Sequence, residues 1–165
     1  MTDAGLQRLD HVAIATHSVA QGYELFCGVL GGEFVNGGDD LDLQIRTLQL
    51  RLPPGVKVEL MQPTTPDSYL ARFLERHGPG FHHMTLFFDD VEKAIAELTQ
   101  QGYELVDTDL TRPSWRETFL RPRTGLGLLQ LADTTLRWDV SADGVTAEDV
   151  LAGRVLWRDD RPVLR

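Results

Sequence analysis

Four side chains that can bind a metal stand at matched positions in the two halves of the chain. His11 and His83 each lie in a short apolar segment, and each is followed by a second apolar segment that carries a polar ligand atom. Glu59 comes 48 residues after His11, and Gln130 comes 47 residues after His83. Two imidazoles and a carboxylate are a common donor set for a divalent transition metal. The spacing therefore predicts a metal site to which both halves contribute.

The elements that must position these side chains form an internal repeat. Three landmark pairs give offsets of 72, 70 and 71 residues: His11 and His83, Gly32 and Gly102, Glu59 and Gln130. In each half, an apolar strand is followed by a capped amphipathic helix, a glycine that ends the helix, and three further strands. The sequence therefore predicts two tandem βαβββ modules and an α+β fold.

The repeat also sets the expected domain limits. We expect one domain over residues 1–132 and a short C-terminal extension over residues 133–165, which lies outside the repeat. The parts of the domain are, in order, module one (8–62), a linker with a short helix (63–79) and module two (80–132). Pro122 and Gly125 predict the turn of the last hairpin.

Composition narrows the classes of partner and location. The formal net charge of −9 argues against nucleic acid as the main partner, because phosphate binding needs a basic surface. Cys27 is the only cysteine, so no intrachain disulfide can form, and we interpret it as a small buried side chain on a helix. The absence of a secretory signal and of an apolar run of membrane-spanning length predicts a cytoplasmic protein with no membrane partner. The acidic stretch 39–42 predicts a solvated loop.

Four segments carry a likeness to a known family: Leu9-Asp10-His11-Val12-Ala13-Ile14-Ala15, Val58-Glu59-Leu60-Met61-Gln62-Pro63, Leu70-Ala71-Arg72-Phe73-Leu74 and Gly80-Phe81-His82-His83-Met84. Over residues 9–131 the chain resembles the vicinal oxygen chelate superfamily, which includes glyoxalase I, extradiol dioxygenases and bleomycin-resistance proteins. Within it, the chain is most similar to members of the methylmalonyl-CoA epimerase type. The resemblance implies that the two modules pack edge to edge and form an open, cup-shaped mixed sheet.

The same resemblance implies a site and a chemistry. By position, His11, Glu59, His83 and Gln130 would hold one divalent ion of zinc, cobalt, nickel, manganese or iron. In such proteins the metal stabilises an enolate-like charge on the substrate while a nearby side chain moves a proton. The resemblance thus implies a metal-dependent isomerase or lyase that acts on a small carbonyl or acyl-thioester substrate, with Glu59 and Gln130 as the catalytic pair.

Gln130 departs from the family pattern, because the epimerases and glyoxalases usually carry a glutamate there. An amide oxygen can bind a cation, but an amide cannot act as a base near neutral pH. The epimerases also carry a glutamate on the strand before the first hairpin turn, where residues 43–52 of this chain contain no carboxylate. Glu59 is then the ligand carboxylate left to move a proton, and Glu117 is the nearest alternative base.

Two arginines are candidates for substrate binding. Arg46 and Arg116 stand on strands expected to line or edge the cup, where a guanidinium could bind a carboxylate or phosphate through two hydrogen bonds. The competing interpretation for each is an exposed, salt-bridging arginine. Strand alternation predicts that Arg116 and Glu117 point to opposite faces, and the same holds for His82 and His83.

Two other functions stay open on the sequence alone. Two histidines and one carboxylate also form the facial triad of non-haem Fe(II) oxygenases, although extradiol enzymes place the carboxylate where this chain has Gln130. A non-catalytic small-ligand-binding or resistance protein would account for the missing bases, but not for three retained ligands. The resemblance implies a homodimer, with the extension as a candidate contact, and the cup could form within one chain or across two.

Overall fold

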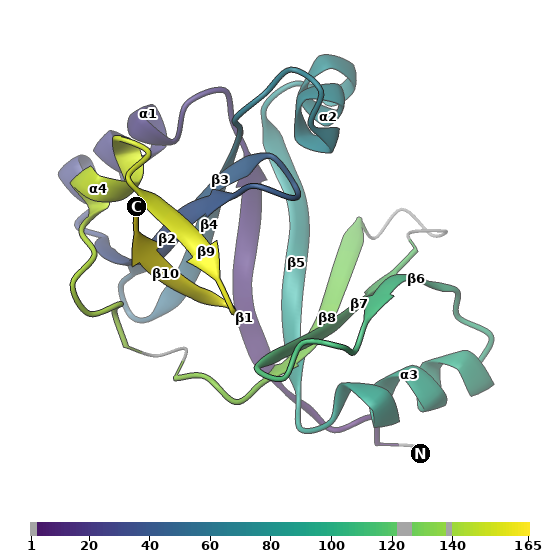
Figure 1. The fold of residues 1–165 in the computed structure, drawn as a ribbon. Helices are drawn as coiled ribbons and strands as arrows, with labels where there is room; N and C mark the ends of the chain where they lie inside the picture. Colours follow the sequence, from purple (N-terminus) through teal and green to yellow (C-terminus); the bar gives the residue numbers. More distant parts are fainter. Residues whose placement is uncertain (1–2, 122–126, 138–139) are drawn as a thin grey trace. The chain divides into compact units, whose positions relative to one another are not determined.

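The structure is a computed structural model that describes residues 3–121, 127–137 and 140–165 (Figure 1). The turn predicted at Pro122 and Gly125 lies outside these residues. The chain forms two compact units: the first unit is Met1–Val12 with His82–Arg137, and the second unit is Ala13–Phe81 with Trp138–Arg165. Helices and a mixture of parallel and antiparallel strands confirm the predicted α+β class. The predicted module limits stay a prediction.

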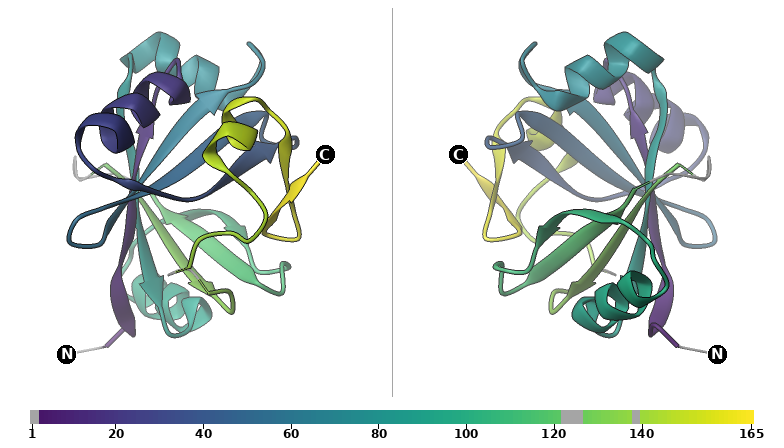
Figure 2. Two further views of the ribbon diagram at one scale, coloured as in Figure 1. Left: turned by 90° about the vertical axis from the view of Figure 1, so that its left-hand side faces the viewer. Right: turned by 90° about the vertical axis from the view of Figure 1, so that its right-hand side faces the viewer.

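The first unit is a sheet covered by one helix. Its elements are most of β1 (Leu6–Ala15), most of β5 (Gly80–Phe88), α3 (Val91–Gln100), β6 (Leu105–Asp109), β7 (Trp115–Leu120) and β8 (Leu128–Thr134). The strand order is β1-β5-β8-β7-β6, with β8 parallel to β5 and antiparallel to β7. Asp90 caps α3, and Val91 and Ala94 of this helix pack against Phe88 and Leu131. Helix α3 lies beside the strands of this unit (Figure 2, right). Strand β8, which carries Gln130, therefore lies between β5 and β7.

Before the C-terminal extension, the second unit contains three antiparallel strands, two α-helices and a π-helical turn. Its elements are α1 (Val19–Tyr23), the π-helical turn η1 (Glu24–Val29), β2 (Glu33–Asp40), β3 (Ile45–Leu52), β4 (Val56–Pro63) and α2 (Tyr69–His77). Ser18 begins α1 by accepting a hydrogen bond from the backbone of Gln21, as the sequence predicted. Val19 then packs against a core that includes Leu48, Leu50 and Leu60. These contacts hold β3 and β4 in one register.

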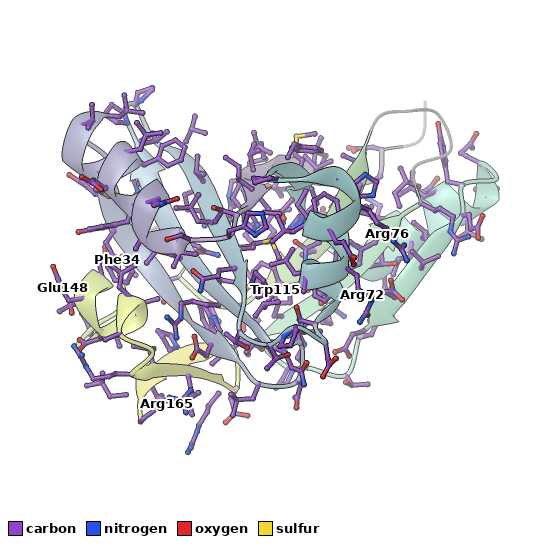
Figure 3. All side chains as sticks on the ribbon, turned by 90° about the horizontal axis from the view of Figure 1, so that it is seen from above. Phe34, Arg72, Arg76, Trp115, Glu148 and Arg165 are labelled. Atoms are coloured by element: carbon purple, nitrogen blue, oxygen red, sulfur yellow. The ribbon has the colours of Figure 1, made fainter. Side chains whose placement is uncertain are left out.

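Residues 140–165 of the C-terminal extension are an integral part of the second unit, whereas Asp133 and Thr134 still belong to β8 of the first unit. The extension contains α4 (Ala147–Leu151), β9 (Val155–Arg158) and β10 (Arg161–Leu164), and β9 pairs in parallel with β2 (Figure 1). Val145, Val150 and Val155 are buried in the same core as Leu48 and Leu50. Figure 3 shows Arg165 beside the β9–β10 hairpin. The extension therefore completes the core of this unit.

The prediction of a solvated loop over residues 39–42 is wrong for its first residues. Strand β2 continues to Asp40, and Asp39 is only 4% exposed. Asp39 stands directly opposite Arg46 in the β2–β3 pair, and this cation makes burial of the carboxylate tolerable.

In the part of the chain that the structure describes, no helix is long and apolar enough to cross a membrane.

Candidate metal centre

Two buried histidines from neighbouring strands lie together in the first unit. His11 of β1 is 2% exposed, and His83 of β5 is 5% exposed. Their ring centroids are 5.7 Å apart, and the ring planes are inclined at 71°. The pairing of β1 with β5 in the sheet order accounts for this proximity. The structure therefore brings together the two imidazoles that the repeat singled out.

Each ring nitrogen of His11 has a neighbouring polar side chain. Its Nδ1 atom lies 2.8 Å from a carboxylate oxygen of Asp10, which is itself buried. A carboxylate only accepts hydrogen bonds, so His11 Nδ1 carries a hydrogen and donates it to Asp10. A carboxylate behind the imidazole is the common arrangement for metal-binding histidines. Nε2 lies 2.9 Å from the hydroxyl of Thr85, a fully buried residue of β5.

His83 is held in the neutral form that a metal ligand requires. Burial first, and then the neighbouring His11 and His82, lower the pKa of its imidazole to about 2, against a hydrogen bond with Gln130 that raises it. His82 Nδ1 lies 2.8 Å from His83 Nδ1. The side chain of His82 therefore reaches its neighbour, although alternation along the strand predicts that it leaves on the other face.

The lowered pKa of His83 predicts acid sensitivity of the metal-free protein. The unfolded chain takes up a proton at His83 below pH 6.5, whereas the folded chain does so only near pH 2, so stability falls as the pH drops through this window. Between pH 7 and pH 5 we expect a contribution of about 2 kcal/mol to the loss of unfolding free energy. Urea titrations in EDTA should show this loss in the wild type, and a smaller loss in His83→Asn. The exposed His17 supplies the control: His17→Asn should keep the full wild-type dependence, and equal dependence in His83→Asn would contradict the prediction.

Gln130 joins the histidines through the registers of β8. It stands opposite Thr85 in the parallel β5–β8 pair and opposite Phe119 in the antiparallel β7–β8 pair. The hydroxyl of Thr85 donates to Gln130 Oε1 over 2.5 Å, and Gln130 Nε2 donates to a carboxylate oxygen of Glu117 over 2.5 Å. The hydroxyl of Thr85 thus contacts both Gln130 Oε1 and His11 Nε2.

This donor set fits a divalent metal. Two imidazoles and an amide oxygen gather within the first unit; the lowered pKa of His83 keeps its imidazole uncharged, and the amide of Gln130 carries no charge that would repel a cation. The three side chains come from β1, β5 and β8, and hydrogen bonds with Asp10 and Glu117 hold two of them, His11 and Gln130.

Glu59 occupies a matching buried position in the second unit. It is 8% exposed and lies between the buried residues Val58 and Leu60 of β4. Gln49 stands directly opposite on β3, and its Nε2 donates to Glu59 Oε1 over 2.9 Å. Burial of a carboxylate in such apolar surroundings requires a polar partner, and the amide of Gln49 supplies one.

The guanidinium groups of the two arginines suggested for substrate binding both form ion pairs with carboxylates of this chain. In the second unit, the guanidinium of Arg46 donates to both carboxylate oxygens of Asp39. In the first unit, Arg116 donates to Asp133 and Glu92 on the face of β7 that Glu117 does not share.

Three supporting residues were not singled out from the sequence. They are Asp10, Thr85 and Gln49, each of which contacts a predicted ligand. Asp10 could have been found, since a carboxylate next to a ligand histidine is a familiar partner. Thr85 and Gln49 could not, because their contacts depend on strand register.

Comparison with known proteins assigns the chain to a protein family. Residues 10–119 match the family model of the Glyoxalase/Bleomycin resistance protein/Dioxygenase superfamily. The mitochondrial methylmalonyl-CoA epimerase of Dictyostelium discoideum is 28% identical over 104 residues, which cover 62% of this chain and 62% of that protein. The ethylmalonyl-CoA/methylmalonyl-CoA epimerase of Cereibacter sphaeroides is 31% identical over 96 residues, 58% of this chain and 71% of that protein.

Solved structures agree with this assignment. The methylmalonyl-CoA epimerase of Mycobacterium tuberculosis superposes with a TM-score of 0.72 at 27% identity, over 82% of this chain and 94% of that one. A methylmalonyl-CoA epimerase in complex with methylmalonyl-CoA and NH4+ has a TM-score of 0.70 at 26% identity, over 79% of this chain and 96% of that one. The family model matches well over half of the chain, so this protein belongs to the Glyoxalase/Bleomycin resistance protein/Dioxygenase superfamily.

Proposed function

We propose that this protein is a metal-dependent isomerase of the methylmalonyl-CoA epimerase type, which acts on an acyl-thioester by enolization. The observation that carries the proposal is the cluster in the first unit, where His11, His83 and Gln130 gather around Thr85. The names of the relatives support an acyl-CoA substrate over other carbonyl compounds.

We propose His11, His83, Glu59 and Gln130 as the ligands of one divalent ion. His11 and His83 lie together in the first unit, and Glu59 would supply the carboxylate by its matched position in the repeat. Gln130 would add an amide oxygen, which hard and borderline cations accept. A bound divalent ion would act as a Lewis acid on the thioester oxygen.

The residues of the chain divide the remaining work. Asp10 holds the ring of His11 with Nε2 directed away from the carboxylate, and Gln49 holds one oxygen of Glu59. In this proposal Glu59 removes the α-proton of the substrate to form the enolate, because Gln130 offers an amide where a base would be needed.

Metal content is the first measurement. Elemental mass spectrometry on untagged protein should find about one zinc, cobalt, nickel, manganese or iron per chain, and His83→Ala should lose it. The exposed His17 supplies a matched control, since His17→Ala should keep the metal. No metal in the wild type, even after reconstitution, would contradict the proposal and favour a ligand-binding protein. Iron together with oxygen uptake on catechols would instead favour a dioxygenase.

Self-association as a homodimer stays a prediction. Light scattering coupled to size exclusion tests it directly. Deletion of the extension is a poor test of the contact, because Val145, Val150 and Val155 belong to the core of the second unit.

A further inference from the structure

The two ends of the Gln130 amide are chemically different, and only one of them can bind a cation. We propose that Glu117 is a positioning residue, which fixes the amide of Gln130 with its oxygen toward His11 and His83. This inference rests on the proposed metal site. It accounts for the use of a glutamine at a position where the resemblance led us to expect a carboxylate.

The orientation of the amide follows from its partners at each end. Gln130 Nε2 donates to Glu117 Oε2 over 2.5 Å, and Gln130 Oε1 accepts from the hydroxyl of Thr85 over 2.5 Å. Rotation of the amide by half a turn would place its oxygen against a carboxylate oxygen, and no hydrogen would lie between them. It would also point the NH2 group into the histidine cluster, where it would exclude a cation. A carboxylate beside the nitrogen end therefore selects the orientation that binds metal.

Glu117 is itself held firmly enough to perform this task. Its Oε1 accepts from the guanidinium of Arg112 over 2.7 Å, and its Oε2 accepts from the indole of Trp115 over 2.6 Å. The ring of Trp115, labelled in Figure 3, packs edge-on against Phe87 with centroids 5.2 Å apart. Both oxygens of Glu117 are thus engaged by donors, which suits a fixed acceptor better than a mobile base.

The second unit contains the same kind of pair in the reverse order. There the amide of Gln49 lies on the third strand of its module, β3, and the carboxylate of Glu59 lies on the fourth, β4. In the first unit the carboxylate of Glu117 lies on β7 and the amide of Gln130 lies on β8. In each pair the partner on the earlier strand holds the proposed ligand on the later strand.

The decisive experiment measures metal affinity and the Gln130 amide in matched variants. Cobalt binding by isothermal titration should be about 10–100-fold weaker in Glu117→Leu than in the wild type. Glu117→Gln retains an acceptor oxygen and should bind nearly as well as the wild type. The exposed Glu75 supplies a control of the same chemical change, since Glu75→Leu should leave the affinity unchanged.

A reciprocal exchange keeps the proposal testable if Glu117→Leu folds poorly. In Glu117→Gln/Gln130→Glu the pair is reversed, so an amide at position 117 holds a carboxylate at position 130, and cobalt binding should equal or exceed that of the wild type. In the metal-free wild type, NMR should show the Gln130 side-chain amide protons protected from solvent exchange, and this protection should disappear in Glu117→Leu.

The outcomes separate this inference from the proposed function. A wild-type protein that binds no cobalt would overturn the proposed function, whereas the exchange protection of Gln130 would still report on its orientation. Cobalt binding of wild-type strength in a folded Glu117→Leu variant would overturn the positioning role. Unprotected Gln130 amide protons in the wild type would overturn it as well.

Discussion

Replacement of Glu59 by Gln should lower kcat/KM by about 10²–10⁴-fold, the usual effect of removing a general base. The change keeps the shape of the side chain and one ligand oxygen, but an amide cannot accept a proton near neutral pH. Glu59 is the proposed ligand that can take up the proton, since Gln130 is itself an amide. We therefore expect Glu59→Gln to retain some metal while turnover is lost.

The assay for this prediction follows the α-proton directly. Methylmalonyl-CoA in deuterated solvent should acquire deuterium at the α-carbon with the wild-type protein, and mass spectrometry measures its rate. Glu75→Gln makes the same change at an exposed carboxylate and should retain the wild-type rate. Wild-type exchange in a metal-loaded Glu59→Gln variant would show that another group moves the proton, and Glu117 would be the next residue to test.

Arg46→Met should destabilise the second unit by about 3 kcal/mol, because it leaves a buried carboxylate without its main cation. The guanidinium of Arg46 makes two hydrogen bonds to Asp39, of 2.6 and 3.0 Å, and a third of 3.0 Å to the carbonyl of Leu151. The Asp39 side chain is 6% exposed. Arg165 also donates to Asp39, over 3.1 Å, and its contact keeps the expected loss at the lower end of the range for buried pairs.

Urea unfolding measures this loss, and two further variants identify its cause. Asp39→Leu/Arg46→Met removes both charges and should recover most of the lost stability, since apolar replacements of buried ion pairs are often close to neutral. Arg154→Met removes an exposed ion pair with Asp149 and should leave the unfolding transition in place. At a temperature where Arg46→Met is folded, its kcat/KM should match that of the wild type. A selective rise in KM would instead support the substrate-binding role that the sequence suggested.

Much of the fold was predictable because its signals are local. The sequence predicted a capped helix in each half, and the structure shows Ser18 and Asp90 as caps that act within a few residues. The offset of about 70 residues between the halves follows from the order of such local signals, so it predicted the α+β class and the pairing of His11 with His83. The expectation for residues 39–42 failed because local composition carries no information about Arg46.

The sequence by itself determined which side chains could bind a metal, since imidazole and carboxylate chemistry is a property of the residue. It also determined the family, through short segments around those side chains. Only the tertiary structure decided what each polar group does. Thr85 meets His11 across 74 residues and Gln130 across 45, and Arg46 meets Leu151 across 105. Hydrogen bonds and ion pairs act over a few ångströms, so the register of strands far apart in the chain decides which of these groups meet.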